Sequence, residues 1–296
     1  MTRTNRALGP WLLLVACSCA HLPEAAADSA AATRQEPAAA APPIRPQDRN
    51  PQSPWYRAAD RGRWYFDFIA GAEYEADYPG SDDNELELDP NIRVMFKDPW
   101  SNRHLLSIGE WRSTFDLTDD LAFSVNVEYE QGRDADDNPA LRGLDEIEDT
   151  VELAPSLHYR IGDFSFAAVA QPDLLNRGKG FVWFVGAGYD KLLFDDRLRL
   201  ATSLDLSGAD STHMRTEFGI TGAEAGRTGN RAYRPDAALK SLSWATTAEY
   251  FFTDRWSLFA GSEVEHYLKE AADSPLIADQ GSDWNVGFGL GMRYSF

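Results

Sequence analysis

From Trp64 to the end of the chain, apolar and polar residues alternate in repeated segments. The clearest segment is the last, WNVGFGLGMRYSF. Its even positions are apolar or aromatic, and its odd positions are polar or glycine. A period of two is typical of a β-strand with one apolar face. The apolar face consists of Trp284, Val286, Phe288, Leu290, Met292 and Tyr294, and it continues to the last residue, Phe296.

The same alternation, in places weaker, predicts ten further strands. They lie at 64–78, 85–97, 103–117, 121–130, 151–161, 164–171, 181–193, 198–206, 242–252 and 256–268. Most have about ten residues or more, the length at which a tilted strand crosses a bilayer. Short polar turns at 162–163, 195–197 and 253–255 contrast with long polar loops at 131–149, 208–240 and 269–283. This asymmetry is typical of an outer-membrane barrel.

The count of strands points to a segment that the alternation misses. Bacterial single-chain barrels have an even number of strands, whereas the pattern yields eleven. We therefore expect one strand to be merged or missed within 98–120. The predicted fold is an all-β, antiparallel up-and-down transmembrane β-barrel of about twelve strands, with ten as the alternative.

A soluble β-sandwich also alternates, so the apolar face could contact either a protein core or lipid. Aromatic residues such as Trp64, Trp244 and Trp256 lie near strand ends, where a barrel meets lipid headgroups. The opposite faces carry many carboxylates, which suit a wet lumen. We therefore predict that Leu258 and the apolar face of the last strand contact outer-membrane lipid, with the glycines of that strand facing the lumen.

The first residues have the layout of a signal peptide, which we place at 1–22. Two arginines precede a short apolar stretch from Leu8 to Ala16, and small residues follow. Cleavage near Ala20 or Ala27 and a lipobox that would place a lipid on Cys17 remain alternatives. Both predict export, and with the barrel pattern they predict the outer membrane of a Gram-negative bacterium.

An Ala/Pro-rich stretch at 23–54 lacks apolar periodicity and is predicted to be a disordered periplasmic linker. The barrel domain is placed at 55–296. The terminal aromatic residue, Phe296, is predicted to be the assembly signal for the barrel-assembly machinery. Hydropathy does not contradict this arrangement, because alternating strands average to a middling value such as the −0.43 of this chain.

Charge and cysteine content exclude several classes of partner and site. A net charge of −19 argues against nucleic acid, because phosphate binding needs a basic surface. The two cysteines, Cys17 and Cys19, both lie in the leader. The barrel therefore has no disulfide framework and no cysteine-based metal site.

Carboxylates dominate the face that we assign to the lumen. They include Glu73, Glu75, Glu85, Glu87, Asp89, Glu128, Glu152, Asp205, Glu249, Glu263 and Glu265. One interpretation is a cation-selective pore or a site for basic solutes. The other, which we favour, is a network in which Arg93, Arg160, Arg199 and Arg293 pair with the acids and fill the barrel.

Three further residues, Ser156, His158 and His104, raise the possibility of a hydrolase. A nucleophile and its base must lie within hydrogen-bond reach, with a third group orienting the base. Ser156 and His158 share a strand face, but such neighbours are common by chance. The five histidines are scattered, and we expect no catalytic residue, no cofactor and no metal site.

Several stretches together resemble the MipA/OmpV family of outer-membrane proteins, the MltA-interacting proteins. They are YPGSD at 78–82; Gly132, Arg133, Leu141, Gly143 and Leu144; EFGIT at 217–221, where Glu217 stands in place of the usual Tyr; the segment 256–277; and the GLGMRYSF end. The resemblance implies a non-enzymatic outer-membrane protein. The family's namesake is a scaffold that links a lytic murein transglycosylase to a penicillin-binding murein synthase, and other members are associated with osmotic response, adhesion or antibiotic interaction.

The most distinctive piece of the resemblance is Ala272-Asp273-Ser274-Pro275, in a long loop. A turn is the simple interpretation, since Asp and Ser bond back to the backbone and Pro fixes φ. A partner contact, or a loop that folds back over the barrel mouth, is the alternative. For the whole chain we expect a scaffold or a protein of envelope integrity, with a small cation-preferring pore or an adhesin as alternatives.

Overall fold

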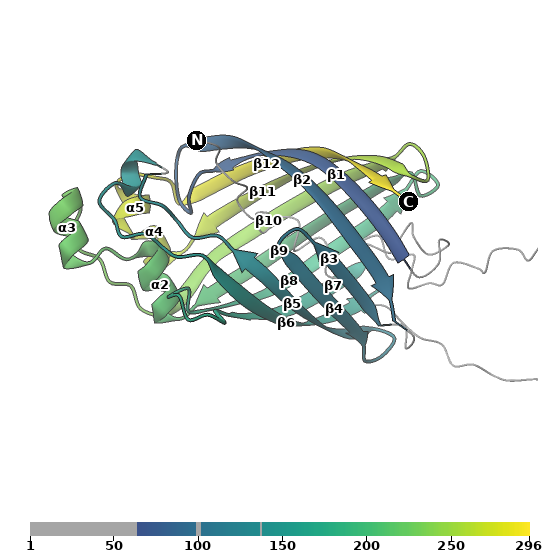
Figure 1. The fold of residues 1–296 in the computed structure, drawn as a ribbon, viewed down its shortest axis with the longest axis horizontal. Helices are drawn as coiled ribbons and strands as arrows, with labels where there is room; N and C mark the ends of the chain where they lie inside the picture. Colours follow the sequence, from purple (N-terminus) through teal and green to yellow (C-terminus); the bar gives the residue numbers. More distant parts are fainter. Residues whose placement is uncertain (1–63, 99–101, 137) are drawn as a thin grey trace, which may run out of the picture.

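The computed structural model describes residues 64–98, 102–136 and 138–296. Twelve antiparallel strands close a barrel in which each strand pairs with its neighbours in sequence and β1 pairs with β12 (Figure 1). The predicted signal peptide and linker, and residues 55–63 of the predicted barrel domain, lie outside the described residues. The strands are β1 (Trp64–Ala76), β2 (Asn84–Lys97), β3 (Arg103–Ser107), β4 (Glu110–Asp116), β5 (Leu121–Glu130), β6 (Thr150–Ile161), β7 (Phe164–Pro172), β8 (Phe181–Leu193), β9 (Leu198–Ala209), β10 (Ala238–Phe251), β11 (Trp256–Tyr267) and β12 (Trp284–Ser295).

The prediction of twelve strands is confirmed, and the missed strand lies where parity placed it. The segment 103–117 is two short strands, β3 and β4, joined by a turn at Ile108 and Gly109. The turn shifts the outward positions from even to odd numbers, so that Leu106 and Trp111 are both exposed. This shift weakens the alternation across the segment and hides the second strand.

Tight turns lie at one end of the barrel and the longer loops at the other, which we call the turn end and the loop end. The loop predicted at 208–240 is shorter in the structure. It covers only 210–237, because β9 ends at Ala209 and β10 begins at Ala238. No helix among the described residues is long and apolar enough to cross a membrane. The loops hold the short helices η2 (Pro139–Leu141), α2 (Ser211–Phe218), α3 (Gly222–Thr228), α4 (Lys269–Ala272) and α5 (Pro275–Ala278).

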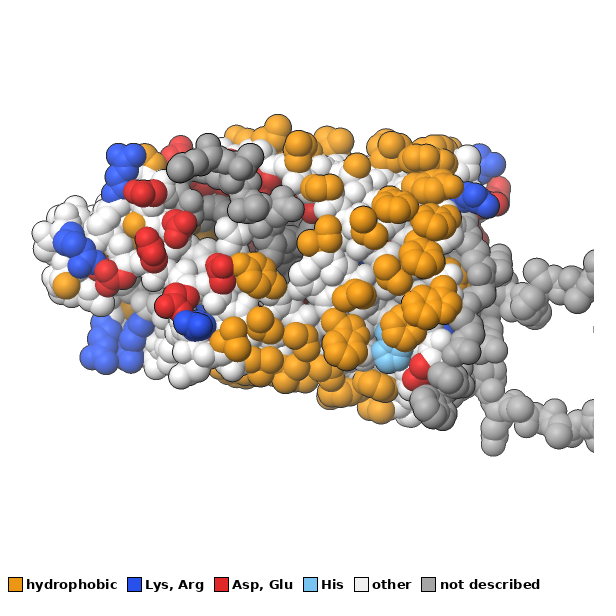
Figure 2. Space-filling model, viewed as in Figure 1, with side chains coloured by type: hydrophobic (Ala, Val, Ile, Leu, Met, Phe, Trp, Pro, Cys, Tyr) orange, Lys and Arg blue, Asp and Glu red, His pale blue; other side chains and the backbone are white. Residues whose placement is uncertain are grey.

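The apolar side chains predicted to contact lipid all lie on the outer face of the barrel. Leu258, Leu290 and Phe288 are each more than half exposed. Figure 2 shows apolar side chains covering the barrel wall, while charged side chains gather at the loop end. At the turn end, the ring of Trp256 packs against Tyr294 with centroids 4.6 Å apart. Such aromatic pairs suit a girdle at the lipid headgroups.

The last residue closes the seam between the first and last strands. The backbone of Phe296 exchanges hydrogen bonds with Phe66 at 3.0 and 3.1 Å, and its ring stacks against Phe66 and Phe68. The predicted role of Phe296 as an assembly signal stays a prediction. Within the lumen, a Cβ on Gly291 would lie 2.4 Å from Cζ of Phe259, so this glycine makes room for the Phe259 ring.

Candidate functional site

The turn-end half of the lumen is filled by ion pairs that cross from strand to strand. Arg199 on β9 contacts Asp190 on β8 at 2.9 Å and Glu249 on β10 at 3.8 Å. Arg293 on β12 contacts the other oxygen of Glu249 at 3.2 Å. The Ser257 hydroxyl on β11 donates to the same oxygen of Glu249 at 2.6 Å. These contacts connect five consecutive strands of the wall through side chains that are buried, except for the partly exposed Arg293.

A second set of paired charges lies across the lumen. Arg103 holds Asp116 with two hydrogen bonds of 2.8 and 3.1 Å. Arg112 contacts Glu110 at 2.6 Å, and its Nε donates to Asn126 at 2.7 Å. Sequence reasoning missed Arg103 and Arg112, because both lie in the segment where the alternation is weak.

The predicted arginine network is therefore present with a partly different membership. Arg199 and Arg293 belong to it, and Arg93 is buried in the lumen directly opposite Asp67 on β1. Arg160 lies next to the turn at 162–163. Its Nε donates to the carbonyl of Gly162 at 2.8 Å.

The loop-end half of the lumen is an acidic cavity of about 380 Å³. Its acidic lining residues are Glu75, Asp77, Glu110, Glu128, Glu130, Glu152, Asp205, Glu217, Glu263 and Glu265, against the basic residues Arg93, Arg133, Lys179 and Lys240. Six of the eleven carboxylates predicted for the lumen line this cavity: Glu75, Glu128, Glu152, Asp205, Glu263 and Glu265. Glu73 lines a separate space of about 60 Å³, and Glu249 belongs to the ion-paired half.

Asp205 and Glu263 on the cavity wall are buried, and each has an oxygen with no hydrogen-bond partner among the described residues. Asp205 is 5% exposed and Glu263 is 6% exposed. Asp205 is accommodated by Gly186, its partner on β8, where a Cβ would lie 1.8 Å from Oδ1 of Asp205. The strand pairing therefore leaves space for this carboxylate without providing a cation.

Four loops meet above the cavity and form a cap with its own apolar core. The core consists of Tyr78, Leu141, Leu144, Ile220 and Leu276. All five belong to segments that carry the family resemblance in the sequence. These segments are far apart in the chain, and the fold brings them together at the barrel mouth.

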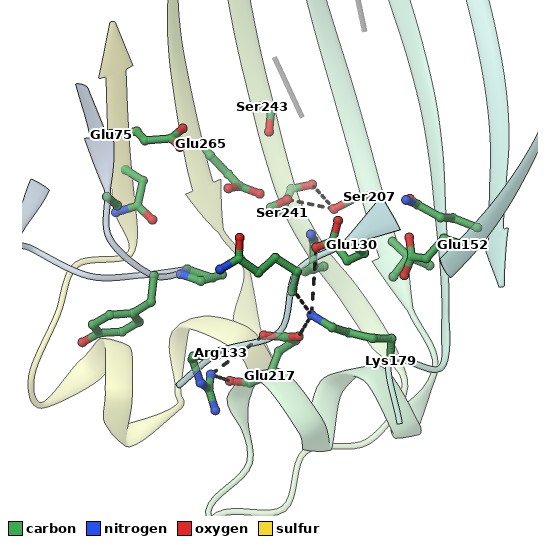
Figure 3. Close-up of a pocket in the computed structure, with 18 of the residues that line it drawn as sticks. Glu75, Glu130, Arg133, Glu152, Lys179, Ser207, Glu217, Ser241, Ser243 and Glu265 are labelled. Atoms are coloured by element: carbon green, nitrogen blue, oxygen red, sulfur yellow. Dashed lines mark hydrogen bonds and ion pairs between the residues drawn. The ribbon is translucent and has the colours of Figure 1, made fainter. Parts of the chain in front are cut away.

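Helix α2 is fastened over the cavity by a buried ion pair (Figure 3). Nζ of Lys179 lies 3.1 Å from Glu217, and Arg133 donates to the Glu217 carbonyl at 2.9 Å. Burial alone would raise the pKa of Glu217, but Lys179 and Arg133 outweigh it and lower that pKa to about 2. On the same helix, burial lowers the pKa of His213 to about 4, and its Nδ1 donates to the Lys179 carbonyl. Glu217 therefore stays charged and His213 neutral at pH 7.

The Ala272-Asp273-Ser274-Pro275 segment lies within this cap. The Ser274 hydroxyl donates to the carbonyl of Phe218 at 2.8 Å and accepts from the backbone N–H of Leu276 at 3.3 Å, which caps α5. Ser274 is fully buried, and Ala272 packs beside the apolar cluster that holds Phe218. The segment is thus a helix cap that ties two loops together over the mouth.

The three residues that suggested a hydrolase do not assemble at the cavity. Ser156 and His158 do share a hydrogen bond of 2.8 Å, but both are buried and neither lines the cavity. His104 contacts Ser113 instead. Among the described residues, no group of three or more His, Cys, Asp or Glu side chains could hold a metal ion.

Comparison with known proteins places this architecture in a family. Residues 69–296 match the family model described as MltA-interacting protein MipA. The chain is 25% identical over 154 residues to outer membrane protein OmpV of Vibrio cholerae serotype O1, and 23% identical over 154 residues to outer membrane protein Omp26La of Vibrio anguillarum. Each match covers 52% of this chain and 58% of the relative, so the chain spans less than two thirds of the relatives it matches.

Solved barrels are similar at much lower identity. A Pseudomonas aeruginosa FadL homologue has a TM-score of 0.40 and 9% identity, covering 86% of this chain and 95% of that one. The translocator domain of the autotransporter NalP from Neisseria meningitidis has a TM-score of 0.40 and 11% identity, covering 79% and 88%. Because the family model matches most of the sequence, this outer-membrane β-barrel belongs to the family of MltA-interacting protein MipA.

Proposed function

We propose that this protein is a non-enzymatic scaffold of the outer membrane that holds murein-cleaving and murein-synthesising enzymes at the periplasmic side. The observation that carries the proposal is the ion-paired half of the lumen. Charges buried between five strands favour a closed, rigid body over an open channel. The family description, which names an interaction with MltA, supports a transglycosylase as one partner.

Two regions are candidates for the contact with these enzymes. One is the predicted linker at 23–54. The other is the turn end, which we assign to the periplasm because short turns face that side in outer-membrane barrels. Its turns carry exposed carboxylates, among them Asp195 and Asp196 between β8 and β9. These carboxylates would attract a basic surface on a partner enzyme.

Binding measurements with purified proteins test the scaffold. The folded, full-length protein is immobilised and exposed to a lytic murein transglycosylase and, separately, to a penicillin-binding murein synthase. We expect both to bind. Loss of binding on deletion of 23–54 would place the contact in the linker, whereas loss in Asp195→Asn/Asp196→Asn would place it in the turns. Absence of binding by either enzyme to the full-length protein would contradict the scaffold.

A cation-preferring pore is the competing function, and the acidic cavity is the observation that favours it. The same lumen opposes passage at the turn end, where arginine side chains pair with the acids. We therefore expect the folded protein to give no stepwise conductance in planar bilayers. Stepwise currents that prefer cations would contradict a closed barrel and would favour the pore as the function.

A further inference from the structure

The barrel wall is incomplete beside the acidic cavity. The short hairpin of β3 and β4 pairs with β2 only through Val94–Lys97. Residues 84–93 of β2 therefore have β1 on one side and no described strand on the other. In Figure 1, β2 and β5 both run past the tip of this hairpin. We call the region bounded by residues 84–93 of β2, the hairpin tip at 108–109 and Tyr129 of β5 the lateral notch.

The lateral notch lies within the apolar band of the barrel, in its loop-end half. Leu86 and Leu88 on its β2 edge are 70% and 78% exposed, and Leu88 pairs with Ala72 at mid-strand. Pro90 lies in the same stretch, and proline is confined to sheet positions where no ladder hydrogen bond is needed. In the membrane orientation assigned above, the notch faces the outer leaflet.

The cavity is continuous from the lateral notch to the far wall of the lumen. Its lining includes Ile108 and Tyr129, whose side chains are exposed on the outer face, and also Asp205 and Glu263 on the opposite wall. The hairpin tip is joined to β5, because the Tyr129 N–H donates to the Gly109 carbonyl at 2.8 Å. A molecule that entered between the 84–93 edge of β2 and this tip would therefore reach these carboxylates without passing through the cap.

The far wall presents carboxyl oxygens that have no hydrogen-bond partner among the described residues. The unpartnered oxygens of Asp205 and Glu263 lie in a wall that also holds Glu265, and Glu75 and Glu265 lie near one another at the cavity in Figure 3. Neither Asp205 nor Glu263 forms a salt bridge with a described residue. Lys179, Arg199 and Arg293 pair with other carboxylates. Burying a carboxyl oxygen without a partner is costly, and a cationic group would offset that cost.

We propose that the cavity binds a single-chain amphiphile with an ammonium head, which enters from the outer leaflet through the lateral notch. The head lies against Asp205 and Glu263, and the alkyl chain leaves between Leu88, Ile108 and Tyr129. A cavity of about 380 Å³ is at the small end of ligand sites, so it holds the head and the first methylenes while the remaining chain stays in lipid. This binding activity is independent of the scaffold function.

The first experiment measures affinity with the full-length protein in lipid nanodiscs. The probes are dodecylamine, dodecyl sulfate as an anion with the same chain, and spermine as a cation without one. Asp205→Asn/Glu263→Gln is expected to weaken dodecylamine binding about tenfold or more, because it removes charge-assisted contacts to the head. Asp145→Asn/Asp236→Asn removes the same number of charges from exposed loop positions and is expected to change affinity less than twofold.

Three outcomes would overturn the proposal in this experiment. Unchanged dodecylamine affinity in Asp205→Asn/Glu263→Gln would remove the two carboxylates from the site. Equal binding of dodecyl sulfate would show that charge is not recognised. Spermine binding as tightly as dodecylamine would show that the alkyl chain contributes nothing and that the notch is not part of the site.

The second experiment needs no variant and tests the route of entry. An alkylamine with a photoreactive diazirine in its chain is bound to the wild-type protein in nanodiscs, irradiated, and the labelled residues are identified by mass spectrometry. Labels are expected at Leu86, Leu88, Ile108 and Tyr129. Labels confined to the cap core, such as Leu141 and Leu276, would show entry through the loops and overturn the lateral route.

Discussion

At the turn end of the lumen, Glu249 lies between Arg199, Arg293 and the Ser257 hydroxyl, whereas at the loop end Asp205 and Glu263 each keep an oxygen without a partner. Both sets of carboxylates are buried on the same barrel wall. A paired charge becomes a structural element, because removing its partner leaves an uncompensated ion. An unpaired one costs stability and leaves a position that a ligand can fill.

The largest effect is expected from breaking the ion-paired half. Arg199→Ala leaves Asp190 and Glu249 with fewer cationic contacts, and breaking a buried pair costs about 3–5 kcal/mol. Reversible urea unfolding in lipid vesicles, followed by tryptophan fluorescence, measures the loss. A decrease of less than about 1 kcal/mol would mean that water or other groups already solvate these acids, and the contrast between the two halves would not hold.

A second substitution tests which face is wet and which contacts lipid. Leu290→Arg is expected to lower the free energy of unfolding by about 2–4 kcal/mol, because it places a charge in the middle of the apolar band. Gly289→Ser is the control on the lumen side, where a Cβ would meet Glu73 at an ordinary 3.5 Å. The same urea experiment compares the two variants. Equal stabilities would contradict the assignment of Leu290 to the lipid face and Gly289 to the lumen face.

The alternation in the sequence predicts which residues face the lumen. It does not predict how far along the barrel axis each charged residue lies, or which residue lies opposite it on the next strand. Alternation places Glu249 and Glu263 on the lumen faces of adjacent strands. Only the strand register sets Glu249 opposite Arg199 and Glu263 opposite Gly287. Register depends on loop geometry, which the period of two does not contain.

The apolar core of the cap could not be predicted from the periodicity of the sequence. Leu141, Ile220 and Leu276 come from loops without periodicity, and the alternation placed Tyr78 at the end of the strand predicted at 64–78, two residues beyond the end of β1. Nothing local therefore shows that these residues share one core. The family resemblance was the only signal in the sequence that singled out these segments. The β3–β4 hairpin was hidden for a different reason, since its turn reverses which positions face outward.

Acidification is expected to loosen the loop end and leave the turn end intact. His213 has a folded pKa of about 4, below its usual 6.5, so the stability it contributes is full above pH 6.5 and is lost as pH falls toward 4. Lowering pH from 7 to 5 should weaken the attachment of α2 by roughly 2 kcal/mol. The pair of Glu217 with Lys179 stays charged in this window, because the pKa of Glu217 is about 2.

A nitroxide attached to Ser211→Cys reports this loosening by electron paramagnetic resonance at pH 7 and pH 5. The label should become more mobile at pH 5. In His213→Gln, whose amide can donate to the Lys179 carbonyl but does not titrate, mobility should not depend on pH. An equal response in both proteins would assign the change to a group other than His213.

The smallest change in stability is expected from Glu263→Gln, in the acidic half. A neutral amide costs less to bury than a carboxylate with an unpartnered oxygen, so the free energy of unfolding should rise by no more than about 1 kcal/mol. The measurement is the urea experiment used for Arg199→Ala, and the two substitutions should have opposite signs. A loss as large as that of Arg199→Ala would mean that Glu263 is held by a cation at its position, and both halves of the lumen would then be structural.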